Sequence, residues 1–164
     1  MQGLLIAITS AQKYVYIQSP YLLPTEPILL ALKTAAAAGV DVRIMIPEKS
    51  DSRMVHWGTM SYLQELMEAG IKIYMYQKGF LHSKLIVCDD CLSSVGSTNM
   101  DFRSFEHNFE INAFMYDKTS ALMLKDIFLS DQKDAKLLHL KEWRMRPWSQ
   151  KVKESVIRLF APLL

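Results

Sequence analysis

The sequence predicts an α/β fold in which a mixed, largely parallel sheet is flanked by helices. Between residues 14 and 77, segments typical of strands alternate with segments typical of helices, as in parallel strands joined by helical crossovers. Gly39 and Gly70 end the two helical segments, each directly before a strand. Beyond residue 77, two short runs around Asp89–Asp90 predict two further strands joined by a turn.

Each element follows from a local signal. Residues 2–12 place apolar side chains at helical spacing, and Thr25 with Pro27 is typical of a helix start. β-Branched and aromatic runs predict the strands. A further helix is expected from Asp117 or Thr119 to about Leu140. The expected helices are 2–12, 26–38, 53–69 and 117–140, before a tail at 142–164, and the expected strands are 14–19, 40–47, 71–77, 81–89, 93–97 and 108–116.

The composition indicates one soluble globular domain over residues 1–164. Half of the residues are hydrophobic and 22% are charged, and a chain of 164 residues can bury an adequate core without disulfides. The net charge of +2 gives no strong field toward nucleic acid. No run approaches the ~20 apolar residues of a membrane span, and the start lacks the basic region of a signal peptide. Cys88 and Cys91 form a single C-x-x-C pair, which we interpret as one strand and one turn cysteine.

The stretch "LHSKLIVCDD" at 81–90 contains the candidate chemistry. His82 and Lys84 are spaced by two, so on a strand they point to the same face. Lysine is seldom buried without a partner. An imidazole and an ammonium on the same face suit attack on a phosphorus ester. The imidazole can act as nucleophile or as general acid and base, while the ammonium binds the phosphate.

Three further polar residues are expected at the same end of the sheet. Ser97 and Asn99 of "GSTN" supply hydroxyl and amide groups, and Gly96 allows close approach to the backbone. Glu110 interrupts an apolar strand, so it needs a partner, for which a histidine is suited. Each signal alone has a structural alternative, because His-x-Lys is common at strand starts and Asp89 or Gly96 can simply begin or end a turn.

The motif and its surroundings resemble a known family. "HSKLIVCD" fits H-x-K-x-x-x-x-D and is followed by "GSTN", which is similar to the HKD signature of the phospholipase D superfamily. The likeness covers nearly the whole chain, which resembles the second, C-terminal half of bacterial cardiolipin synthases. It is carried by "YIQSPYLLP", "AAAAGVDVRIMIPEKSD", "AGIKIYMYQKGFLHSK", "VGSTNMDFRSFEHNFEINAFMYD" and "RLFAPLL".

The resemblance implies a role for each matching position. His82 corresponds to the catalytic histidine, Lys84 to the phosphate-binding lysine, and Asp89 to the motif aspartate, which is structural or orienting. Ser97 and Asn99 match the substrate-binding donors, and the acid that supports the histidine matches Glu110. The implied reaction is transfer of a phosphatidyl group between two phosphatidylglycerol molecules through a phosphohistidine, giving cardiolipin and glycerol, with no metal and no other cofactor.

The sequence departs from that family in holding one HKD motif, whereas the family site uses two. The second histidine of two-motif relatives is more often the general acid and base, so we expect this role for His82, with nucleophile as the alternative. The chain is then an excised half, a truncated product or one member of a homodimer. Its expected partners are phosphatidylglycerol, a bacterial membrane surface on which it is peripheral, and the missing half or a second copy. The alternative function is a homodimeric phosphodiesterase or nuclease, although nucleic acid is not expected as a partner.

Other residues leave two interpretations open. Tyr14, Tyr16, Tyr21 and Tyr74, with ten methionines, can form core or line a lipid channel. Arg103 can contact a phosphate or pair with Asp101. The stretch "EWRMRPW" suits either a membrane interface or a surface turn that packs a tryptophan. The apolar "RLFAPLL" would dock on the domain or contact the bilayer.

Overall fold

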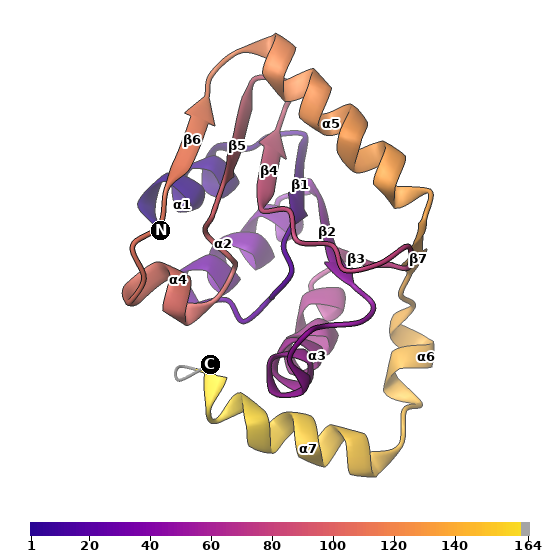
Figure 1. The fold of residues 1–164 in the computed structure, drawn as a ribbon. Coiled ribbons are helices and arrows are strands. Elements are labelled where there is room, and N and C mark those ends of the chain that lie inside the picture. Colours follow the sequence, from indigo (N-terminus) through magenta and orange to yellow (C-terminus); the bar gives the residue numbers. More distant parts are fainter. Residues whose placement is uncertain (162–164) are drawn as a thin grey trace.

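A computed structural model describes residues 1–161, and the last three residues of "RLFAPLL" lie outside it. Its centre is one sheet with the strand order β6-β5-β4-β1-β2-β3-β7 (Figure 1). The strands are β1 (Tyr14–Gln18), β2 (Asp41–Pro47), β3 (Lys72–Tyr76), β4 (Leu85–Cys88), β5 (Leu92–Gly96), β6 (Asn112–Met115) and β7 (Ala135–Leu137). The helices are α1 (Gln2–Ser10), α2 (Glu26–Ala37), α3 (Arg53–Glu68), α4 (Phe102–Glu106), α5 (Lys118–Gln132), α6 (Leu140–Arg144) and α7 (Trp148–Arg158).

The sheet is mixed, as predicted, but the prediction that it is largely parallel is wrong. Only the pairs β1–β2 and β2–β3 are parallel, and α2 and α3 are the crossovers between these strands. The pairs β1–β4, β4–β5, β5–β6 and β3–β7 are antiparallel. The reason is that parallel neighbours need a long crossover, whereas β4 and β5 are joined by the tight turn at Asp89 and Asp90, both with positive φ.

The predicted elements up to residue 77 agree with the structure to within one or two residues, and Asp117 does cap α5 by accepting the N–H of Ser120. The later ones differ. β4 begins at Leu85, so His82 and Lys84 precede it, and β6 is shorter than 108–116, so Glu110 precedes it. α5 ends at Gln132 because the chain then pairs with the edge of β3 as β7, a tertiary contact that local propensity does not reveal.

The sheet is covered on both faces. Figure 1 shows α1, α2 and α3 on one face and α5 across the other. In β1, Val15 and Ile17 join the core beneath α1–α3, while Tyr14 and Tyr16 join Phe128 of α5. Tyr74 lies in the same core as these tyrosines, which supports the core interpretation over a lipid channel, while the half-buried Tyr21 hydrogen-bonds to Asp51.

The stretch "EWRMRPW" forms the corner between α6 and α7. Trp143 is buried, the Arg146 guanidinium stacks on its ring at 3.4 Å, and Arg146 also pairs with Glu154. Trp148, by contrast, is largely exposed. The packed-tryptophan interpretation therefore holds for Trp143 only. None of the helices described within residues 1–161 has both the length and the apolar character needed to cross a bilayer.

Gly96 is required by the spacing of β5 and β6, not by a turn. A Cβ atom at this position would lie 1.8 Å from Oδ1 of Asn112 and 2.3 Å from the carbonyl oxygen of Ile111. The sequence predicted close approach of a ligand here, whereas the group that approaches is the neighbouring strand.

We therefore predict that Gly96→Ala lowers the free energy of unfolding by about 1–3 kcal/mol, since the backbone of β6 must shift to admit the methyl group. Urea denaturation followed by circular dichroism measures this. An unchanged midpoint would show that the two strands separate without cost.

Candidate active site

The sheet topology brings five of the six predicted site residues to one end of the sheet. Because β4 runs antiparallel to β1, the start of β4 lies beside the end of β1, with Leu85 opposite Gln18. The end of β5 and the start of β6 meet at this same end of the sheet, with Gly96 opposite Asn112. The predicted residues at this end are His82, Lys84, Ser97, Asn99 and Glu110.

His82 and Lys84 are in direct contact. The Nζ atom of Lys84 lies 3.1 Å from both ring nitrogens of His82 and donates a hydrogen bond to the His82 carbonyl oxygen at 2.8 Å. The lone-pair directions of the two ring nitrogens diverge, so an atom equidistant from both lies against the ring and not along either lone pair. His82 is exposed, and burial lowers the pKa of Lys84, against the charges of Glu110, Asp101 and Asp51.

The residue between them anchors this segment to the core. The Ser83 hydroxyl donates to Oε1 of Gln18 at 2.6 Å, and Nε2 of Gln18 donates to Asp131 of α5 at 2.8 Å. Gln18 is only 1% exposed, so its amide needs these partners. The chain Ser83–Gln18–Asp131 thus connects the His82–Lys84 segment to β1 and α5.

Glu110 is held by neutral donors. The Ser97 hydroxyl donates to Oε2 of Glu110, and Asn108 donates to Oε1 at 3.2 Å. Burial would raise the pKa of Glu110, but the hydrogen bonds from Ser97 and Asn108 and the charge of Lys84 outweigh it and lower the pKa. The histidine partner expected for Glu110 is not found, since no hydrogen bond joins it to His82 within residues 1–161.

Asn99 lies at the start of the segment that leads into α4. Its backbone N–H donates to the Ser104 hydroxyl at 3.2 Å, and in the described part of the chain its buried Oδ1 has no hydrogen-bond partner. The Asp101 carboxylate caps α4 by accepting the N–H of Ser104 at 2.7 Å. The exposed Arg103 forms no ion pair with Asp101 in the described residues, so the pairing considered from the sequence is not observed.

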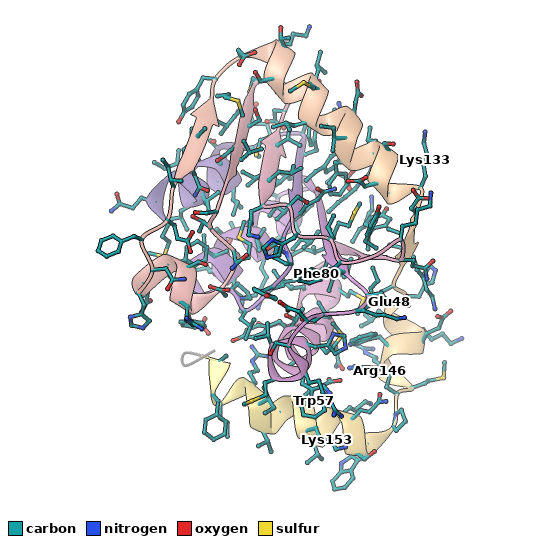
Figure 2. The ribbon with its side chains drawn as sticks, viewed as in Figure 1. Glu48, Trp57, Phe80, Lys133, Arg146 and Lys153 are labelled. Carbon is teal, nitrogen blue, oxygen red and sulfur yellow. The ribbon has the colours of Figure 1, made fainter. Side chains whose placement is uncertain are left out.

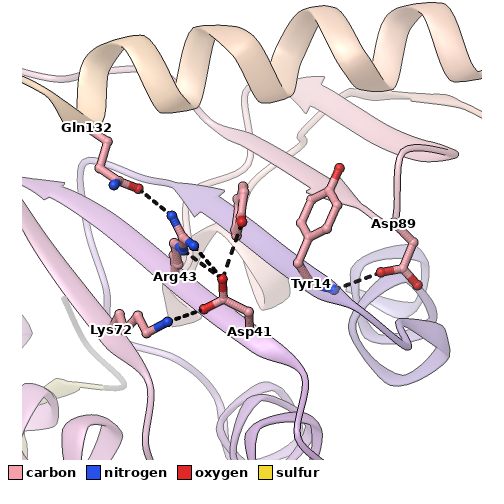
Figure 3. Close-up of polar contacts among 7 residues, drawn as sticks. Tyr14, Asp41, Arg43, Lys72, Asp89 and Gln132 are labelled. Atoms are coloured by element: carbon pink, nitrogen blue, oxygen red, sulfur yellow. Dashed lines mark hydrogen bonds and ion pairs between the residues drawn. The ribbon is translucent and has the colours of Figure 1, made fainter.

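Asp89 is not part of this group, although the motif predicted it among the catalytic residues. It lies at the opposite end of β4, where its carboxylate accepts the backbone N–H groups of Gln12, Lys13 and Tyr14 at 2.6–2.9 Å. Figure 3 shows the bond from Tyr14. With a φ of 52°, it also forms the turn into β5. Its contacts therefore hold the start of β1 against the β4–β5 turn, which is the structural role that the resemblance allowed.

An open cavity of about 610 Å³ adjoins His82 and Lys84. Its walls are the segment from Lys78 to Leu85, the buried Gln18, and the α5 side chains Leu124, Ile127 and Asp131. The ring of Phe80, labelled in Figure 2, lies 5.2 Å from the ring of His82. Apolar and polar walls together suit a ligand with a phosphate and an attached apolar group.

Sequence reasoning missed Gln18 and Asp131. A signal for Gln18 was present, since a glutamine in the apolar strand "YVYIQ" must find partners once buried. Nothing local pointed to Asp131, which reaches Gln18 only because α5 crosses the sheet. Within residues 1–161, no three His, Cys, Asp or Glu side chains are close enough together to hold a metal ion.

Comparison with known sequences finds relatives along nearly the whole chain. The family model described as "Cardiolipin synthase, PLD-like domain" matches residues 4–132. The cardiolipin synthase of Geobacillus sp. (strain WCH70) is 51% identical over 157 residues, covering 96% of this chain and 31% of the relative. Cardiolipin synthase 1 of Staphylococcus epidermidis (strain RP62A) is 49% identical over 157 residues, again 96% of this chain but 32% of the relative. The chain thus spans about a third of the length of these relatives.

Solved structures share the fold at low sequence identity. The phospholipase D family member Nuc from Salmonella typhimurium gives a TM-score of 0.71 at 23% identity, over 84% of this chain and 90% of that one. The phosphatidylserine synthase of Haemophilus influenzae Rd KW20 gives 0.78 at 17% identity, over 99% of this chain and 44% of that one.

We predict that Asp89 stabilises the folded domain. Asp89→Ala leaves three backbone N–H groups without their acceptor and places alanine at a positive φ, so the free energy of unfolding should fall by about 3 kcal/mol. Asp117→Ala, which removes one N-cap hydrogen bond by the same substitution, should cost only about 1 kcal/mol. Urea denaturation measures both, and equal losses would contradict the role given to Asp89.

Proposed function

This chain belongs to the cardiolipin synthase family of phospholipase D-like domains, and we propose that it supplies one half of a phosphatidyl-transfer site. The reaction is transfer between two phosphatidylglycerol molecules, giving cardiolipin and glycerol. The chain forms one phospholipase D-like domain with one HKD motif. The remainder of a longer protein, or a second copy of this chain, supplies the other.

The observation that carries the proposal is the contact between Lys84 and His82 beside an open cavity. An ammonium 3.1 Å from both ring nitrogens positions a phosphate next to the imidazole. The cavity of about 610 Å³ leaves room for the rest of a lipid head group. Glu110, with its lowered pKa, lies near enough to act on the charge of Lys84.

The roles follow from these positions. Lys84 binds the phosphate oxygens, Ser97 and Asn99 bind the substrate, and Glu110 stays ionised and orients Ser97. Ser83 holds the segment in place through Gln18. His82 is the general acid and base, and the histidine of the other half is the nucleophile.

The chemistry balances in two steps. In the first, the nucleophilic histidine forms an N–P bond to the phosphatidyl group. The P–O bond to glycerol breaks, and His82 gives its proton to the leaving oxygen. In the second, His82 takes a proton from a hydroxyl of another phosphatidylglycerol. That oxygen attacks phosphorus, the N–P bond breaks, and cardiolipin is released.

One experiment separates this proposal from its alternative. The chain is assayed alone, and also grafted in place of the matching segment of the Geobacillus sp. (strain WCH70) relative, for cardiolipin and glycerol from phosphatidylglycerol vesicles. An inert monomer alone with an active graft supports the half-site. Turnover by a dimer of the isolated chain identifies the second copy as partner, and DNA cleavage without lipid turnover overturns the proposal.

In the grafted enzyme, we expect His82→Ala to reduce the transfer rate by about 10³-fold or more, because the leaving oxygen loses its proton donor. His139→Ala is the matched control, since His139 makes no side-chain cap bond at the start of α6 and is exposed. Rates are read from glycerol release. Substantial activity in the His82 variant alone would remove this residue from the chemistry.

The pH dependence tests Lys84. Burial lowers its pKa from the ordinary 10.5, so its ammonium loses the proton at lower pH than a surface lysine does. The transfer rate should therefore fall as pH rises through that lowered pKa. In Lys84→Arg the guanidinium stays charged, so the activity that remains should show no such fall. The same alkaline decline in both proteins would contradict phosphate binding by Lys84.

A further inference from the structure

Helix α7 packs on the domain with its polar side chains inward. Glu154 is buried and accepts two hydrogen bonds from Arg146, at 2.6 and 3.1 Å. Arg158 donates to Glu65 of α3 at 2.7 Å and stacks on Tyr62 at 4.2 Å. A surface helix of a globular protein normally turns its apolar stripe to the core. The docking of α7 on α3 instead uses charged groups on its inner side.

Apart from the half-buried Ile157, the apolar side chains of α7 point outward and form a continuous stripe with the C-cap Leu159. Trp148, Val152, Val156 and Leu159 follow one another at spacings of four, four and three residues, which places them on one face of the helix. They are 79, 38, 49 and 79% exposed, in that order. Within residues 1–161 nothing covers this face, which we call the α7 stripe.

Cations without carboxylate partners lie beside the stripe. Lys153 of α7 and Arg53 of α3 both approach the ring of Trp57, at 5.9 and 5.6 Å from its centroid. Figure 2 shows Trp57 and Lys153 together where α7 passes α3. Neither cation pairs with a carboxylate in the described part of the chain. Of the six Lys and Arg in residues 140–161, Arg144, Arg146 and Arg158 pair with Glu68, Glu154 and Glu65, whereas Lys141, Lys151 and Lys153 form no ion pair in the described residues.

We propose that α7 is a membrane-contact helix, whose stripe of Trp148, Val152, Val156 and Leu159 enters the interface of an anionic bilayer while Lys153 and Arg53 bind lipid phosphates. A helix with one apolar face, basic flanks and a tryptophan lies in the plane of the lipid surface. Its location on the far side of α3 makes this surface separate from the His82 cavity, and lipid binding by α7 requires no transfer activity.

The charge pattern favours a bilayer over a protein partner. Protein interfaces are depleted of lysine, and a buried unpaired cation there is costly. An anionic membrane instead attracts each nearby Lys or Arg while their apolar neighbours leave water. We therefore propose a bilayer as the partner of the α7 stripe. Contact with a second copy of the chain is an alternative outcome that the experiment must be able to detect.

The test is sedimentation of the 164-residue chain with vesicles of phosphatidylglycerol and phosphatidylcholine, compared with phosphatidylcholine alone. Binding should be at least about tenfold stronger to the anionic vesicles and should weaken with added salt. Val156→Asp should weaken it about tenfold or more. Leu30→Asp is the matched control, because Leu30 is an exposed helical side chain on α2, and it should change binding by less than about twofold.

Fluorescence gives a second measurement. The emission of the exposed Trp148 should shift to shorter wavelength on vesicle binding. Trp148→Phe should reduce that shift and leave only the part due to the half-buried Trp57, since Trp143 is already buried. Equal binding by Val156→Asp and Leu30→Asp would overturn the proposal. So would a dimer, detected by light scattering, that Val156→Asp dissociates while neither protein binds vesicles. Vesicle binding by the isolated chain, together with a grafted enzyme that makes no cardiolipin, would leave this proposal standing and count against the proposed function alone.

Discussion

The candidate site depends on one buried amide. Gln18 ends the central strand β1, where the backbone pairs with β2 on one side and β4 on the other. Its side chain is enclosed, so it must use the Ser83 hydroxyl and the Asp131 carboxylate as partners. Ser83 lies between His82 and Lys84, and these three residues precede the regular pairing of β4. Together with the buried Leu81 and the hydrogen bond from the Gly96 N–H to the Lys84 carbonyl oxygen, this anchor holds the segment that brings imidazole and ammonium together.

The residues that stabilise the fold and the residues proposed for the chemistry lie at opposite ends of the sheet. At one end, Asp89 joins the start of β1 to the β4–β5 turn through three backbone N–H groups. Beside that end, Asp41 is bound by Arg43 and Lys72 (Figure 3), and burial is outweighed by these cations, which lower the pKa of Asp41. At the other end, Lys84 loses hydration and has a lowered pKa. A partly buried cation without an ion-pair partner is costly, and a bound phosphate removes that cost.

Sequence reasoning reached local features and missed those set by packing. The strands and helices to residue 77 and the Asp89–Asp90 turn follow from periodicity and turn signals. The spacing of two predicted that His82 and Lys84 lie together, but on a strand, whereas both residues precede β4. β7 depends on a vacant edge beside β3, and the Glu110–Ser97 pair depends on where β5 meets β6, so neither is encoded locally. The stretch "EWRMRPW" left both a membrane interface and a packed tryptophan open. Only the structure shows that Trp143 turns inward and that Trp148, with the apolar face of α7, turns outward.

The central claim is that Lys84 holds a phosphate against the imidazole of His82. Histidine side-chain ¹⁵N resonances of the 164-residue chain, titrated with inorganic phosphate, test it most directly, with His56, His107 and His139 as internal references and His82→Ala to assign the signal. The account predicts that the His82 resonances shift with saturation and that Lys84→Met abolishes the response. Absence of a shift at His82, or an equal shift in Lys84→Met, would contradict it.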